Sequence, residues 1–223
     1  MKQKGKVAII LGATGLTGSL LLQKLLLDDR YDCIKIFTRR PTGINHQKLV
    51  EIPANLLELE KYNSDFIADE VFCCVGTTAK KTPDKVMYKN IDYGIPVMAA
   101  KLCVKNQIPV FIVVSSIGAN TKSKVFYSRT KGEMEQEVLK LNISKTYILQ
   151  PSFIVGARKE KRTGEKVGIV IANLVKPLMF GPFKKYRAIQ ASTIANAIIY
   201  LANNNFPKRI VASDEIQELG KEI

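Results

Sequence analysis

The chain has 223 residues, of which 46% are hydrophobic and 24% are charged, and its formal net charge is +14. This length and apolar fraction predict a folded chain with its own core and exclude an intrinsically disordered protein. No apolar run approaches the ~18–20 residues of a membrane-spanning helix, and the first run leads into a glycine turn rather than a signal-peptide cleavage site. We therefore expect a soluble protein of the cytoplasm, without a transmembrane segment.

Short apolar runs alternate with helical patterns through the first two thirds of the chain. Strands are predicted at residues 6–11, 33–38, 48–52, 70–75, 108–114 and 146–150, and helices at residues 19–27, 84–106 and 125–141. Such alternation is typical of a parallel sheet covered by helices on both faces. We therefore predict an α/β fold with a doubly wound parallel sheet, formed by residues 1–223 as a single domain.

The alternation weakens after Pro151. Residues 167–175 and 192–203 still have helical patterns, but residues 156–166 are polar and basic. Nine basic and two acidic residues lie between positions 156 and 190, which is most of the positive excess in the second half of the chain. We predict that residues 152–190 form a small lid-like region, basic and apolar, over the carboxyl ends of the strands.

Three glycines follow the first predicted strand at intervals of three residues: Gly12, Gly15 and Gly18. Glycines between a buried strand and a helix let the backbone turn sharply and let a pyrophosphate approach the helix N-terminus. There, free N–H groups and the helix dipole favour negative charge. The position of this turn predicts a Rossmann-like, dinucleotide-binding start to the chain. A turn that serves packing alone is the alternative.

The end of the second predicted strand carries Arg39 and Arg40 and no carboxylate. An Asp or Glu at this point would bind the 2′-hydroxyl of the adenosine ribose in an NAD-binding protein. A guanidinium instead suits a 2′-phosphate, which it can hold with two parallel hydrogen bonds. The sequence therefore favours NADP(H) over NAD(H), with two solvated arginines as the alternative.

A second set of polar residues follows the fourth and fifth strands. Gly76 would let the backbone pass close to a cofactor, and Ser115 and Ser116 come directly after the strand at 108–114. Tyr127 and Lys131 follow, four residues apart and so on one face of the predicted helix. A lysine ammonium beside a phenol favours the phenolate, so Tyr127 could exchange a proton while a serine hydroxyl polarises a substrate carbonyl. We favour Ser116 as that serine, with Ser115 as the alternative.

Metal and hydrolase chemistry have little support in the sequence. The four cysteines, at positions 33, 73, 74 and 103, form no Cys-x-x-Cys pair, and His46 is the only histidine. A zinc site therefore lacks ligands, and we expect no metal. A Ser-His-Asp triad would need His46 as its base, and the polar loop around this residue argues against that role.

Taken together, these motifs resemble a known family. The chain is similar to short-chain dehydrogenases/reductases of the atypical, NAD(P)H-binding subgroup, and in particular to the Tat-interacting protein 2 oxidoreductase family and its bacterial relatives. The shared motifs lie at residues 12–18, 39–40, 72–78, 115–119, 127–133, 150–152 and 158–165, so they span nearly the whole chain. The string Phe-Cys-Cys-Val-Gly-Thr-Thr at 72–78 is the most distinctive of them.

The resemblance implies a role for each matching residue. The pyrophosphate would lie against the glycine turn, the 2′-phosphate against the arginine pair, and the nicotinamide end beside the tyrosine and lysine. The implied cofactor-binding residues are Gly12, Thr14, Gly15, Leu16, Thr17, Gly18, Arg39, Arg40, Val75, Gly76, Tyr127, Lys131, Ile154 and Arg162. The implied catalytic residues are Ser116, Tyr127 and Lys131. The family usually adds an asparagine from the helix after the fourth strand, and Asn90 is the nearest candidate, with a surface helix residue as the alternative.

The favoured function is that of an NADPH-dependent oxidoreductase that moves a hydride to or from a small carbonyl or alcohol substrate. The alternative is a catalytically weak NADP(H) sensor that docks on a protein partner, because a fold does not determine a function. The Tyr-Lys pair favours the enzyme, since a sensor has no need of it. We expect no nucleic-acid binding, because no recognised binding motif accompanies the positive charge. The sequence is compatible with a monomer or a homodimer.

Overall fold

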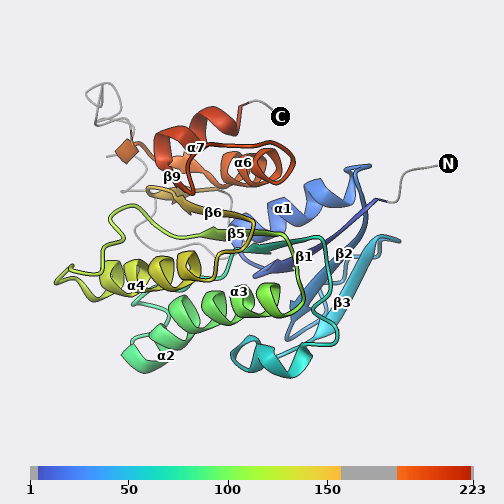
Figure 1. The fold of residues 1–223 in the computed structure, drawn as a ribbon, viewed down its shortest axis with the longest axis horizontal. Coiled ribbons are helices and arrows are strands. Elements are labelled where there is room, and N and C mark those ends of the chain that lie inside the picture. Colours follow the sequence, from blue (N-terminus) through green and yellow to red (C-terminus); the bar gives the residue numbers. More distant parts are fainter. Residues whose placement is uncertain (1–4, 157–184, 222–223) are drawn as a thin grey trace.

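The computed structural model describes residues 5–156 and 185–221, and its centre is a seven-stranded sheet in which all neighbouring strands are parallel (Figure 1). The order across the sheet is β3-β2-β1-β4-β5-β6-β9. These strands are β1 (Lys6–Leu11), β2 (Tyr31–Thr38), β3 (Leu49–Pro53), β4 (Glu70–Cys73), β5 (Val110–Val114), β6 (Lys145–Gln150) and β9 (Ile210–Ala212). The order reverses between β1 and β4, which confirms the predicted doubly wound, Rossmann-like sheet.

Helices cover both faces of the sheet (Figure 1). One face carries α1 (Leu16–Leu26), α6 (Ala191–Asn203) and α7 (Ser213–Leu219). The other carries the 3₁₀ helix η1 (Leu56–Tyr62), then α2 (Lys85–Lys89), η2 (Asn90–Gly94), α3 (Ile95–Lys105) and α4 (Phe126–Lys140). Two layers of helices around one sheet therefore give two cores, one on each face.

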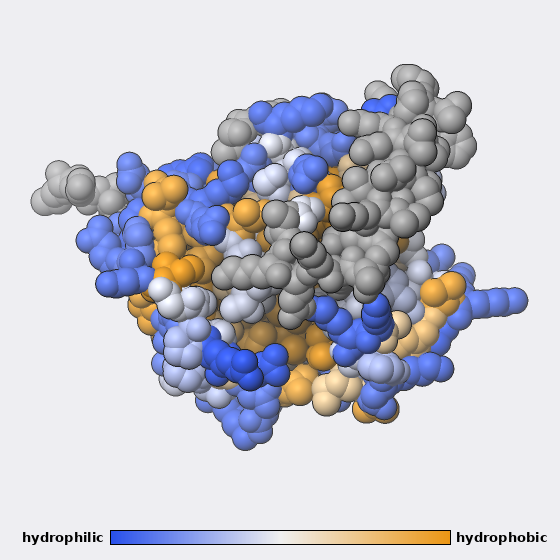
Figure 2. Space-filling model, turned by 180° about the vertical axis from the view of Figure 1, so that it is seen from behind, coloured by the Kyte–Doolittle hydropathy of each residue, from blue (hydrophilic) through white to orange (hydrophobic). Residues whose placement is uncertain are grey.

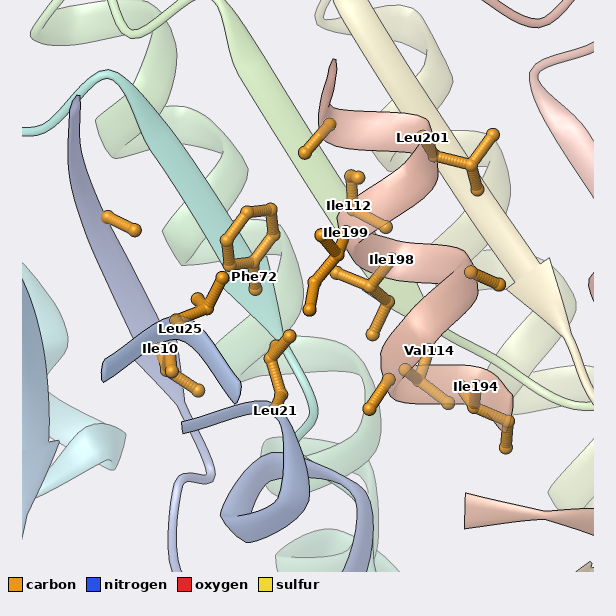
Figure 3. Close-up of a cluster of buried hydrophobic side chains, with 14 of the residues drawn as sticks. Ile10, Leu21, Leu25, Phe72, Ile112, Val114, Ile194, Ile198, Ile199 and Leu201 are labelled. Carbon is orange, nitrogen blue, oxygen red and sulfur yellow. The ribbon is translucent and has the colours of Figure 1, made fainter. Parts of the chain in front are cut away.

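The first core shows how the helices are held on the sheet. In Figure 3, Leu21 of α1 and Ile198 of α6 lie against side chains of the sheet such as Phe72 and Ile112. These four residues are fully buried. Strands covered on both faces need apolar side chains at every position, and β5 is buried along its whole length. This requirement explains why its sequence reads as a continuous apolar run.

The predicted helix at 84–106 contains a π turn. α2 passes directly into the π-helical segment η2, which passes directly into α3. Turns of this kind carry an extra residue and are frequent at functional sites. Within η2, Asp92 is fully buried, whereas Asn90 is exposed. The π turn therefore divides one long helix into two parts and points a carboxylate into the protein.

The C-terminal part of the fold differs from the prediction. β9 adds a seventh strand beside β6 and leads into α7, and neither element was predicted because a three-residue strand has too little alternation to detect. Of the predicted lid at 152–190, residues 157–184 lie outside the described residues, and so does the helical pattern at 167–175. The described ends contain β7 (Ile154–Val155) and β8 (Ile189–Gln190), which pair with each other. The lid stays a prediction.

A buried polar cluster joins the amino ends of the central strands to α6. Glu70, only 2% exposed, accepts hydrogen bonds from Lys6 Nζ and from the Tyr31 hydroxyl, each at 2.7 Å. Lys6 Nζ also donates to Asn203 Oδ1 at 2.8 Å. Burial raises the pKa of Tyr31, and the Glu70 carboxylate adds to that shift. These contacts occupy the amino edge of the sheet, so an open site belongs at its carboxyl edge.

The described surface is mixed in character. Figure 2 shows the side turned away in Figure 1, where apolar areas lie among hydrophilic side chains. Large exposed apolar side chains such as Leu27, Ile67 and Val86 come from different parts of the chain. Within residues 5–156 and 185–221, no helix is both long and apolar enough to cross a membrane.

Candidate functional site

The glycine turn lies where the sheet order reverses, the place at which parallel α/β sheets bind ligands. Gly12 has a φ of +80°, and a Cβ on it would lie 2.9 Å from the backbone carbonyl carbon of Cys74. Only glycine therefore lets the turn pass the segment that leaves β4. A Cβ on Gly18 would overlap the carbonyl oxygen of Gly12, so α1 packs directly against the turn. The glycines thus bring together the turn, the start of α1 and the segment after β4.

The start of α1 is open to a ligand. The helix begins at Leu16, three residues earlier than predicted, and Gly15 caps it without a side-chain hydrogen bond. The backbone N–H groups of its first turn therefore have no side-chain acceptor, and the helix dipole adds partial positive charge there. Thr14 and Gly15 are exposed, whereas Thr17 is buried. This geometry fits a pyrophosphate.

The arginine pair borders the same turn. β2 runs beside β1 with Leu11 opposite Phe37, so the carboxyl end of β2 places Arg39 and Arg40 next to the glycine turn. Thr38 Oγ1 donates a hydrogen bond to the carbonyl oxygen of Arg40 at 2.8 Å, which fixes the backbone as it leaves the strand. Both arginines are exposed, and in the described part of the chain no carboxylate pairs with either. Two available guanidiniums at this position fit a 2′-phosphate.

Asp92 and Lys131 form a buried ion pair at the centre of the site. Lys131 Nζ lies 2.9 Å from Asp92 Oδ1, and the two side chains are 3% and 0% exposed. Asp92 Oδ2 accepts a hydrogen bond from the backbone N–H of Thr77 at 2.8 Å. Burial acts to lower the pKa of Lys131, but the Asp92 carboxylate and the Tyr127 phenol raise that pKa above its usual value. The ammonium therefore stays charged although it is out of contact with water.

Gly76 connects this ion pair to the glycine turn. A Cβ on Gly76 would lie 3.6 Å from Asp92 Oδ1 and 3.8 Å from Lys131 Nζ, and Gly76 itself is exposed. Val75 is buried, and its backbone nitrogen would lie 3.0 Å from a Cβ on Gly12. The ammonium of Lys131 is thus directly beneath the loop that borders the glycine turn.

Two tyrosine rings pack together beside the ion pair. Tyr127 is half-buried in the first turn of α4, and its ring meets that of Tyr88 edge-on, with centroids 6.1 Å apart. Tyr88 is 2% exposed, and its hydroxyl has no hydrogen-bond partner among the residues described. Burial raises the pKa of Tyr88, and the Asp92 carboxylate and Tyr127 raise it further. Tyr88 is therefore a neutral phenol that holds one side of the Tyr127 ring.

The structure distinguishes the two serines that follow β5. Ser115 Oγ is hydrogen-bonded to Glu135 of α4, and Gln150 Nε2 donates to the same carboxyl group at 2.9 and 3.0 Å. Ser116 Oγ is also buried, but it has no partner in the described ranges. A buried hydroxyl without a partner indicates a place where water or a ligand binds. This geometry favours Ser116 over Ser115 as the serine available to a substrate.

The segment after β6 reaches the start of α1. Ile154 is half-buried in β7, and a Cβ on Gly156, two residues later, would lie 3.1 Å from Leu16 Cδ1. This contact places β7 beside the predicted pyrophosphate site. Arg162 lies outside the described residues, so its cofactor contact stays a prediction.

Three buried polar side chains were missed in the sequence: Tyr88 and Asp92, which belong to the site, and Glu135, which is bound to Ser115 beside it. Of the two interpretations of Asn90, the structure favours the surface helix residue, because Asn90 is exposed and lines a separate cavity. Asp92 is the residue that this helix contributes. A carboxylate in a helical pattern usually indicates a solvated face, and its burial here depends on the π turn, which periodicity does not reveal. Tyr88 and Glu135 lie four residues from Asp92 and Lys131, which is the only signal that could have identified them.

The separate cavity has a volume of about 410 Å³ and lies between η1 and the start of α3. Leu56, Lys61, Asn90 and Met98 are among its lining residues, and it is bordered by neither the ion pair nor the glycine turn.

In the described ranges, no group of three or more His, Cys, Asp or Glu residues could hold a metal. All four cysteines are free, and burial raises the pKa of the Cys73 thiol to about 11, so it is unreactive at neutral pH.

Comparisons with known proteins identify the family of the chain. Residues 8–212 match the model of the NAD dependent epimerase/dehydratase family. The chain is 35% identical over 173 residues to protein FMP52, mitochondrial, of Candida albicans, which covers 75% of this chain and 76% of that protein. It is 30% identical over 169 residues to protein HTATIP2 of Rattus norvegicus, which covers 74% of this chain and 68% of that protein. These matches confirm the resemblance to atypical short-chain dehydrogenases/reductases.

A solved structure supports the fold. The Bordetella bronchiseptica enzyme WbmG in complex with NAD aligns with a TM-score of 0.71 at 14% identity, covering 99% of this chain and 77% of that chain. At this identity the likeness concerns the fold alone.

The names of the relatives contradict one expectation. The FMP52 relatives are named mitochondrial proteins. The prediction of a cytoplasmic location is therefore wrong.

Proposed function

Because the chain belongs to the NAD dependent epimerase/dehydratase family, we propose that it is an NADP(H)-dependent oxidoreductase that acts on a small carbonyl or alcohol substrate. The observation that carries the proposal is the buried ion pair of Lys131 and Asp92, which holds a charged lysine beside Tyr127 and beneath the exposed Gly76. A charged lysine in this place supports both the binding of a ribose and the chemistry of a phenol.

The residues around the crevice fit an NADP(H) molecule. The uncapped start of α1 supports a pyrophosphate, with Thr14 and Gly15 open to solvent. Arg39 and Arg40 support a 2′-phosphate, because no carboxylate of the described chain competes for them. In the proposed arrangement, Val75 borders the adenosine and Ile154 borders the nicotinamide end.

The catalytic roles follow from the chemistry of the side chains. A nicotinamide, when bound, supplies or accepts the hydride. In the direction of reduction, Tyr127 gives its phenolic proton to the carbonyl oxygen as the carbonyl carbon becomes that of an alcohol. Lys131 stabilises the phenolate that remains, and solvent returns the proton. Ser116 Oγ donates a hydrogen bond to the same carbonyl oxygen, which orients the substrate. Oxidation of an alcohol is the reverse of these steps.

The cofactor part of the proposal is tested by titrating the protein with NADPH and with NADH, following fluorescence or heat. We expect tighter binding of NADPH, and we expect the double variant Arg39→Ala/Arg40→Ala to lose roughly tenfold or more of that affinity, since charged hydrogen bonds to the 2′-phosphate are lost. Its NADH affinity should change little. The control is Lys140→Ala/Lys221→Ala, which removes the same charge from two exposed helix ends.

The catalytic part of the proposal is tested in a second experiment. Purified protein is screened with NADPH against carbonyl compounds, and Tyr127→Phe is compared with the wild type on any compound that is reduced. We expect turnover to fall by roughly 10²–10⁴-fold without loss of NADPH affinity, because only the proton donor is removed. Equal turnover in the variant would exclude the proposed acid. Binding of NADPH with no turnover of any carbonyl would favour the NADP(H) sensor instead.

A further inference from the structure

The charge of the site is balanced inside the protein. Lys131 carries one positive charge, and its ion-pair partner Asp92, which also accepts a hydrogen bond from the Thr77 N–H, carries one negative charge. Burial raises the pKa values of the neighbouring Cys73 and Tyr88, so neither adds a charge at pH 7, and burial also raises the pKa of Glu135, the other carboxyl group that Lys131 attracts. The ion pair therefore has a net charge of zero, whereas a site that used Lys131 alone would have a charge of +1.

This balance matters for a ligand that exists in two charge states. An oxidised nicotinamide ring carries a positive charge, and a reduced ring is neutral, while the phosphate groups of the two forms are the same. The interaction of one buried charge with another is strong at short range, because little water screens it. An unbalanced Lys131 would therefore disfavour the oxidised ring and leave the reduced ring almost unaffected.

We propose that Asp92 is a charge-balancing residue that lets this site hold the oxidised cofactor as well as the reduced one. The inference rests on the proposed function, because it takes the nicotinamide end to lie beside Lys131. It goes beyond that function because it assigns the Asp92 carboxylate an effect on the relative affinity for the oxidised and the reduced cofactor. A residue that only supported the fold would affect both forms alike.

The test compares dissociation constants for NADP⁺ and NADPH in the wild type and in Asp92→Asn, and it needs no substrate. Asparagine keeps the shape of the side chain and removes its charge. At pH 6.5, where the unpaired Lys131 most readily keeps its proton, we expect the ratio of Kd for NADP⁺ to Kd for NADPH to rise roughly tenfold. At pH 8.5 the rise should be smaller, because a buried lysine without a carboxylate partner loses its proton more easily.

Removing the charge of Lys131 instead of that of Asp92 should change the ratio of Kd for NADP⁺ to Kd for NADPH in the opposite direction. Lys131→Met leaves the carboxylate unbalanced, so the ratio should fall below the wild-type value, even though both ligands bind more weakly. The double variant Asp92→Asn/Lys131→Met should return the ratio to near the wild-type value. This cycle separates the effect of charge from a general loss of affinity. It also keeps the proposal testable if Asp92→Asn does not fold.

The matched control is Glu70→Gln. Glu70 is also a buried carboxyl group in an ion pair, but its partner is Lys6, and the pair lies at the amino edge of the sheet, away from Lys131. Its removal should leave the ratio within twofold of the wild type. A ratio that stays within twofold in Asp92→Asn at both pH values would overturn the proposal. If the wild type bound neither nucleotide, the proposed function would fail instead, so the two failures are distinguishable.

Discussion

Neighbouring residues of this protein differ in whether their polar groups border the candidate site or bind within the core. Ser115 and Ser116 are neighbours in the sequence, but only Ser115 has a partner in the described structure. That partner, Glu135, belongs to the helix that also carries Lys131. The same helix therefore holds one buried polar group for the site and another for the core.

The buried Glu135 gives a pH-dependent prediction. Burial raises the pKa of Glu135 from its ordinary value of 4.5, while hydrogen bonds from Ser115 and Gln150 act in the other direction. A carboxyl group with a raised pKa binds more protons in the folded state, so its favourable contribution is lost as pH rises through that pKa. In Glu135→Gln, the unfolding free energy relative to wild type should therefore increase between pH 4.5 and pH 7.

Denaturant unfolding across this pH range checks the prediction. Glu137→Gln, on the exposed face of the same helix and paired with Lys140, controls for the loss of a carboxylate. A difference between Glu135→Gln and wild type that stays constant with pH, or that decreases, would contradict the assigned shift.

At the scale of elements, α4 is positioned by a backbone contact. A Cβ on Gly132 would lie 2.5 Å from backbone atoms of Asn120 and Thr121, in the loop that joins β5 to α4. Backbone atoms cannot rotate away as a side chain can, so Gly132→Ala must shift the loop or the helix. We expect the unfolding free energy to fall by about 1–3 kcal/mol, and NADPH affinity to fall with it because Lys131 is the adjacent residue.

Gly94→Ala is the control for Gly132→Ala. Gly94 also has helical dihedral angles, but the nearest atom to its added Cβ would be the carbonyl oxygen of Lys89 at 3.9 Å. Alanine should be neutral there or stabilise the helix by up to about 1 kcal/mol. Thermal and denaturant unfolding of the two variants measure the difference. A similar loss in both would show that the close contact at Gly132 is not the cause.

Elements with strong patterns were predictable, and contacts between elements were not. The apolar runs identified six of the seven strands of the sheet, and the turn at Gly12 and the Tyr127–Lys131 spacing indicated the site. The ion pair of Asp92 was not predictable, because a π turn leaves no mark in apolar periodicity. The hydrogen bond from Tyr31 to Glu70 joins residues far apart in the chain, so no local pattern could reveal it.

At the scale of the whole molecule, the two edges of the sheet have different tasks. The amino edge is closed by the cluster of Lys6, Tyr31, Glu70 and Asn203. The carboxyl edge bears the glycine turn and the ion pair of the site. Variants at the two edges should therefore separate stability from ligand binding.

Glu70→Gln tests this separation. The substitution removes a buried charge and weakens the hydrogen bonds that join β1, β2 and β4, so we expect a loss of about 1–3 kcal/mol in unfolding free energy. NADPH affinity should stay within twofold of the wild type, because the cluster is at the opposite edge from the glycine turn. A large loss of affinity in folded Glu70→Gln would contradict the division between the edges.

The helix from Lys85 to Lys105 is interrupted by the π turn at η2, which rotates the side chains of α3 about the helix axis relative to those of α2. An α-helix advances by about 100° for each residue, so deleting one residue between 90 and 94 would rotate one half of the helix against the other by that angle. Tyr88 could then keep its place beside Tyr127, or Ala99 and Leu102 could keep theirs in the core, but both could not. Substitutions on the outer surface of this segment are compatible with the site, whereas a change in its length is not.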